Sequence, residues 1–133
     1  MRRRLRRVLL AALLVAPSLA GAVTEEDFKI RTAQDLLDLC TVPTTDPLYG
    51  SALHFCHGYL VGAVQYHLTE NAGPEGNPLV CFPTPLPTRN DAVSQFITWL
   101  QAHSQYLNDN PVEVEFRFLA EKWPCAKKEG SKP

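Results

Sequence analysis

The 133-residue sequence lacks the short motifs that mark common catalytic and metal-binding sites. It has no Gly-x-Ser-x-Gly nucleophile elbow, no paired-carboxylate signature and no His-Glu-x-x-His run, and its four cysteines are never spaced as Cys-x-x-Cys. Although His54, His57 and His67 lie in one stretch, no carboxylate or third ligand accompanies them at helical spacing. We therefore expect no enzyme, no metal site and no cofactor.

A long hydrophobic run is also missing. The apolar block Val8–Ala16 is too short to cross about 30 Å of hydrocarbon as a helix. Five arginines precede it and small residues follow it, which is the pattern of a secretory signal peptide. Cleavage fits after Ala20 or after Ala22, and we prefer Ala22. Residues 1–22 are therefore predicted to be a Sec-type signal peptide.

Positive charge is scarce in the rest of the chain. The 13 Lys and Arg residues include the five arginines of the signal segment, whereas none of the 14 Asp and Glu residues lies there. The mature chain would have 8 basic and 14 acidic residues, a net charge near −6. Such a surface argues against nucleic acid or anionic lipid as a partner and allows a basic protein partner.

The four cysteines lie in the exported part of the chain. An even number of cysteines in an oxidising compartment predicts two disulfides, for which three pairings exist. Because Cys40 ends one predicted helix and Cys56 lies about two turns into the next, we predict a Cys40–Cys56 bridge across a helical hairpin. By elimination Cys81 pairs with Cys125.

Local signals predict one all-α domain of about four helices over residues 23–126. Helix starts are indicated by four cap pairs: Thr32 with Asp35, Asp46 with Pro47, Thr88 with Asp91, and Asn110 with Pro111. The second helix should run from about residue 47 to 68, followed by a Pro- and Gly-rich loop to residue 88. Residues 112–118 alternate like a strand, but the Asn-Pro start and the lack of a second strand favour helix. Residues 127–133 are predicted to be a disordered tail.

The stretch from Leu53 to His67 should be the central helix. Gly58 and Gly62 each cost a helix about 1 kcal/mol relative to alanine. We therefore predict that a neighbouring helix packs closely against these two glycines. The alternative, a membrane Gly-x-x-x-Gly dimer motif, would need a longer apolar span.

Five segments follow one another in a definite order along this domain. They are Asp35-Leu36-Leu37-Asp38-Leu39-Cys40, Cys56-His57-Gly58-Tyr59-Leu60-Val61-Gly62, Cys81-Phe82-Pro83, a helix with Phe96, Trp99 and Leu100, and Trp123-Pro124-Cys125. This series, from about residue 32 to 125, resembles the Rap/Tai immunity-protein family. The resemblance implies an all-helical, disulfide-bonded periplasmic protein that binds and blocks a peptidoglycan amidase toxin of type VI secretion. It also implies that a homodimer can form.

Such a protein should contact its partner through a loop that the disulfide-bonded helices keep rigid. We expect that contact on the loop of residues 104–110, with Tyr106, Asn108 and Asp109 touching the toxin, since tyrosine is enriched at binding hot spots. Two other functions share this outline. They are a small periplasmic acid-stress chaperone, in which histidines and carboxylates would titrate, and an envelope accessory protein.

Overall fold

The computed structural model describes residues 22–126, and it is all-α as expected. Its four helices are α1 (Ala33–Cys40), α2 (Tyr49–Glu70), α3 (Arg89–Ala102) and α4 (Pro111–Lys122), with short 3₁₀ turns η1 (Asp27–Lys29) and η2 (Ser104–Tyr106). Within the described residues the only β pairing is an isolated bridge between Val80 and Pro124. The helical interpretation of residues 112–118 is confirmed. The predicted signal peptide, up to residue 21, and the predicted tail, residues 127–133, lie outside the described residues.

Three of the four predicted helix caps are confirmed. Thr32 and Asp35 form a complete capping box on α1. The Thr88 hydroxyl accepts the backbone N–H of Asp91 at 3.2 Å and thereby caps α3. The Asn110 side chain accepts two backbone N–H groups of α4, with Pro111 at the first helical position. These caps satisfy N–H groups that have no partner inside their own helix.

The fourth predicted cap, at Asp46, is wrong. The helix α2 begins at Tyr49, two residues later than predicted, and Leu48 is its N-cap. Asp46 instead makes a turn ahead of the helix, because its carboxylate accepts the backbone N–H of Leu48 at 2.7 Å and its carbonyl accepts that of Tyr49 at 3.0 Å. An aspartate followed by proline marks such a turn as readily as a helix start.

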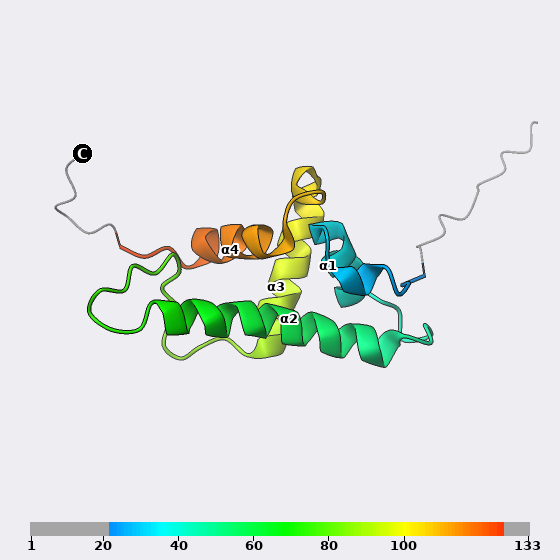
Figure 1. Ribbon diagram of the computed structural model, residues 1–133, viewed down its shortest axis with the longest axis horizontal. Helices are drawn as coiled ribbons and strands as arrows, with labels where there is room; N and C mark the ends of the chain where they lie inside the picture. The colour runs from blue at the N-terminus through cyan, green and yellow to red at the C-terminus, as the bar shows by residue number, and fades with distance from the viewer. Residues whose placement is uncertain (1–21, 127–133) are drawn as a thin grey trace, which may run out of the picture.

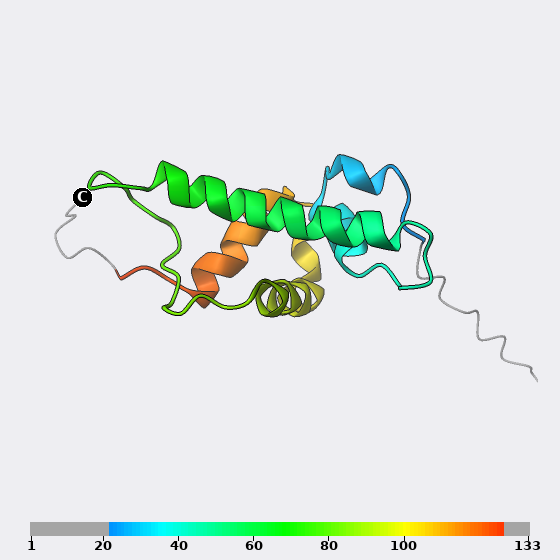
Figure 2. The same cartoon turned by 90° about the horizontal axis from the view of Figure 1, so that it is seen from below.

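The long helix α2 runs along one side of the molecule and the other three helices pack beside it (Figure 1). Near its N-terminal half lies α1, and near its C-terminal half lies α4, where the rings of His67 and Phe116 are 4.9 Å apart. The helix α3 crosses the direction of α2, and in the turned view it is seen nearly end-on (Figure 2). The four helices therefore enclose one core.

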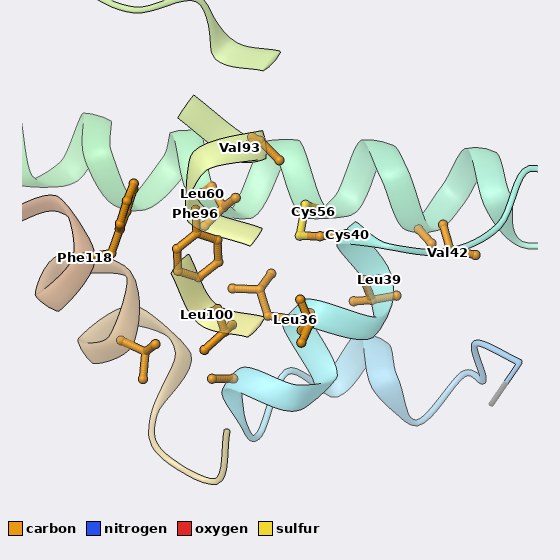
Figure 3. Close-up of a cluster of buried hydrophobic side chains, with 14 of the residues drawn as sticks. Leu36, Leu39, Cys40, Val42, Cys56, Leu60, Val93, Phe96, Leu100 and Phe118 are labelled. Carbon is orange, nitrogen blue, oxygen red and sulfur yellow. A yellow bond between two sulfur atoms is a disulfide. The ribbon is translucent and has the colours of Figure 1, made fainter. Parts of the chain in front are cut away.

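That core forms where side chains of all four helices meet around α3 (Figure 3). Leu36 and Leu39 of α1 and Leu100 of α3 are completely buried, with Phe96 and Phe118 packed ring to ring at 5.7 Å. Beside them lies the Cys40–Cys56 disulfide, which has a Cα–Cα distance of 5.2 Å. Burial of this apolar surface is the main driving force for folding.

Both predicted disulfides are confirmed. The first, Cys40–Cys56, ties the end of α1 to α2. The second, Cys81–Cys125, ties the loop after α2 to the segment after α4, with a Cα–Cα distance of 4.8 Å. The backbone N–H of Cys81 also donates to the carbonyl of Trp123 at 2.9 Å. The long loop is thus anchored at its middle.

The predicted packing role of Gly58 and Gly62 is wrong within the described structure. Both glycines are exposed, and a Cβ added at either would meet no described atom within 4 Å. The buried side of α2 carries Cys56 and Leu60 instead, and Gly58 lies on the opposite side of the helix. A close approach does occur at Gly76 in the loop, where a Cβ would collide with the backbone of Asn71.

Candidate functional site

The predicted contact loop is built on an aromatic stack at the end of α3. The Trp99 ring lies nearly parallel to that of His103, at 4.2 Å between centroids, and to that of Tyr106, at 5.7 Å. On the Tyr106 ring, the Arg117 guanidinium lies 4.5 Å from the ring centroid. Arg117 is itself held by Glu113, at 2.9 Å. The half-buried Tyr106 ring therefore contacts both an indole and a cation, which favours its observed rotamer.

The backbone of the same loop caps another helix. The carbonyl of Leu107 accepts the N–H of Gln34 at 2.8 Å, and the carbonyl of Asp109 accepts the N–H of Ala33 at 3.0 Å. Two N–H groups at the start of α1 are thus satisfied by residues more than 70 positions away in the sequence. Asn108, between the two carbonyls, is exposed. Tyr106, Asn108 and Asp109 are together on one rigid turn, and their contact with a partner stays a prediction.

A second candidate centres on Glu115, which is absent from the sequence-based prediction. This side chain belongs to α4 and is only 3% exposed. Its Oε2 atom has no hydrogen-bond partner among the described residues, and none of the ion pairs formed there includes it. Burial raises the pKa of the Glu115 carboxyl from its ordinary value of 4.5 to about 9. The group is therefore protonated and uncharged at neutral pH.

The sequence does contain a signal for this burial. Pro111, Val114 and Phe118 are spaced as i, i+3 and i+7, and all three are buried. Position 115 is the i+4 member of the same stripe, so a glutamate there faces the core. The strand-like alternation of residues 112–118 places Glu115 among the polar residues and so hides this register.

Glu115 lines an open, mainly apolar groove of about 250 Å³ between α2, α3 and α4, which we call the Glu115 groove. Val64 of α2, Phe96 of α3 and Phe118 of α4 lie on its walls, and the loop before α3 contributes Leu86. Leu86 is 66% exposed although it is a large apolar side chain. A mainly apolar hollow with a small number of polar groups is the usual form of a binding site.

Another groove, of about 390 Å³, lies beside His67 on α2. The His67 Nε2 atom is buried without a hydrogen-bond partner in residues 22–126, while its Nδ1 is 3.3 Å from the amide nitrogen of Asn71. Leu79, which is 62% exposed, and Val112 also line this groove. Like the Glu115 groove, it is open to solvent and lined mainly by apolar side chains.

The histidines are not brought together as metal ligands. His54 is exposed, His57 is half-buried and His67 is buried against Phe116. Over residues 22–126 there is no group of three His, Cys, Asp or Glu side chains that could hold a metal ion. In the same range, no helix combines the length and the hydropathy needed to cross a membrane.

The described residues form a small all-helical fold held by two disulfides. The chain belongs to the Rap1a immunity protein family, whose model matches residues 32–125. The match covers all four helices and all four cysteines. No curated protein and no solved structure matches the chain. Family membership indicates an immunity protein that binds a protein effector.

Proposed function

We propose that this protein is a periplasmic immunity protein that binds and blocks a peptidoglycan amidase effector of type VI secretion. The observation that carries the proposal is the family match, which spans the whole described helical core. The two disulfides support it, because disulfides persist in oxidising compartments such as the periplasm. The signal pattern of residues 1–22 supports export to the same compartment.

The proposed mechanism is steric occlusion without chemistry, in keeping with a generally non-enzymatic family. A preorganised surface loses little conformational entropy on binding, so more of the contact energy appears as affinity. The Tyr106 turn fits this requirement, because its ring is stacked and its backbone is hydrogen-bonded to α1. A homodimer, which the resemblance allows, stays a prediction that sedimentation of the mature protein would test.

The acid-stress alternative receives no support from the most perturbed carboxyl. A switch that acts at low pH needs groups that gain protons as the pH falls below neutrality. Glu115 has already gained its proton at pH 7, because burial raises its pKa to about 9. In the folded protein the Glu115 carboxyl would change its charge above pH 7, near its pKa of about 9.

The test is inhibition of peptidoglycan amidases encoded by the same genome. Purified residues 23–133, with disulfides formed, are added to each amidase, and cleavage of peptidoglycan is followed by chromatography of the released fragments. We expect one amidase to lose its activity at about one equivalent. The reduced and alkylated protein is the matched control and should not inhibit. Full activity of every amidase in the presence of excess protein would refute the proposal.

A further inference from the structure

The Glu115 groove has a polar feature that the fold itself does not use. The carboxyl of Glu115, only 3% exposed, lines a mainly apolar hollow, and its Oε2 lacks a hydrogen-bond partner among the described residues. A buried polar atom without a partner costs about 1–3 kcal/mol in general. The unpartnered Oε2 atom is therefore a group that a ligand could satisfy.

The net charge of the described residues, and not the charge of the groove lining, favours a positively charged partner. Residues 22–126 contain five Lys and Arg against 13 Asp and Glu, so a positively charged partner is attracted to the domain as a whole. Within residues 22–126, Arg89 is the one basic side chain that lines the groove, and it is exposed and forms no ion pair with Glu115. Burial, followed by the nearby Glu115 carboxylate, raises the pKa of the Tyr59 phenol.

We propose that the Glu115 groove receives a lysine side chain of the protein partner, with its ammonium on the Glu115 carboxylate and its aliphatic stem along Val64 and Phe118. This inference rests on the proposed function, because it supplies the surface and the chemistry of that partner contact. The carboxyl gives up its proton to solvent when the ammonium arrives, so the buried pair is formed by two opposite charges.

Lysine fits this groove better than arginine does. Its charge is compact and its four-carbon stem is apolar, matching a hollow whose walls are almost entirely hydrocarbon. A guanidinium carries five N–H donors and needs several acceptors, whereas Gln65 and Glu115 are the acceptor-bearing side chains on this groove. The exposed Leu86 at its rim can cover the stem of an inserted side chain.

The first experiment uses n-butylammonium, which has the carbon chain and charge of a lysine side chain, and n-butanol as its neutral counterpart. Each is titrated into ¹⁵N-labelled residues 23–133 while backbone amide shifts are recorded. We expect saturable shifts near Val64 and Phe118 with n-butylammonium, at least fivefold weaker binding of n-butanol, and loss of that preference in Glu115→Gln. The variant Glu113→Gln, at an exposed site on the same helix, should keep the preference. Equal binding of the two probes, or an unchanged preference in Glu115→Gln, would overturn the proposal.

The second experiment uses the amidase that the wild-type protein inhibits. Glu115→Gln and Leu86→Asp should each weaken inhibition at least tenfold, whereas Leu79→Asp, at a similarly exposed leucine on the other groove, should not. One Lys→Met substitution on the amidase should reproduce the loss.

If both groove variants inhibit as strongly as the wild type, this inference is overturned and the proposed function is left intact. If the groove variants change the sedimentation mass instead, a second copy occupies the groove and the inference is wrong. An absence of inhibition by the wild type would refute the proposed function, and the n-butylammonium titration would still decide the chemistry of the groove.

Discussion

Replacing Glu115 with glutamine should change how the stability of this protein depends on pH. Glutamine keeps the size of the side chain and its hydrogen-bonding capacity but cannot ionise. In the folded state burial raises the pKa of Glu115 from 4.5 to about 9. The unfolded chain is expected to keep the ordinary value. Between these two pKa values the folded state therefore holds a proton that the unfolded state has released.

The sign of the effect follows from this difference in bound protons. Where the folded state binds more protons, the free energy of unfolding falls as the pH rises, by about 1.4 kcal/mol per pH unit. The contribution of Glu115 is most favourable below about pH 4.5 and is progressively lost up to about pH 9. At pH 7 the wild type should have lost about 3 kcal/mol relative to acidic pH. The side chain is only 3% exposed, so solvent screening removes little of this amount.

The measurement is urea unfolding with the disulfides intact, followed by far-ultraviolet circular dichroism at each pH from 4 to 9. The free energy of unfolding of Glu115→Gln minus that of the wild type should rise by about 3 kcal/mol between pH 4 and pH 7. Glu113→Gln is the matched control, because Glu113 is exposed and pairs with Arg117 on the surface of the same helix. Its difference from the wild type should stay within about 1 kcal/mol. A difference for Glu115→Gln that does not vary with pH would refute the argument that burial perturbs this carboxyl.

Further predictions concern one disulfide, two glycines and a helix cap, and all of them are measured by the same unfolding experiment at pH 6. Replacing both Cys81 and Cys125 with serine opens a loop of 44 residues and should lower the free energy of unfolding by about 4 kcal/mol; a loss below 1 kcal/mol would show that the loop is held by its other contacts. Gly58→Ala should stabilise the protein by up to about 1 kcal/mol because the site is open and helical, whereas Gly76→Ala should destabilise it because a Cβ meets backbone; the reverse order would contradict the observed packing. Asn110→Ala should cost about 1 kcal/mol by removing the cap of α4, and an unchanged stability would show that Pro111 alone starts the helix.

The success of the helix predictions has a local cause. A cap such as Thr88 with Asp91 involves residues three positions apart, so its whole interaction is written in a short stretch of sequence. Asp46 followed by Pro47 fits either a turn or a helix start, and the structure has the turn. The family resemblance was visible for a related reason, since the order of the cysteines and their neighbours is a property of the sequence itself.

The candidate site was predicted less well than the fold. A tyrosine on a loop makes the Tyr106 turn a candidate from sequence, but the anchoring of that turn to Ala33 and Gln34 joins segments far apart in the chain. Glu115 was missed because burial of a charged residue is improbable from composition alone. Only the packing of α4 against α2 and α3 shows that the groove around it exists.

The sequence by itself thus determined the all-α class, most helix starts, the two disulfide pairs and the family. Each depends on residue type, on short spacings or on counting. Tertiary structure alone decided which faces are buried. It placed Gly58 and Gly62 on an open face, against expectation, and it placed the Glu115 side chain in the interior. The physical reason is that helical periodicity limits which residues share a face, whereas the packing of the other helices decides which face becomes the core.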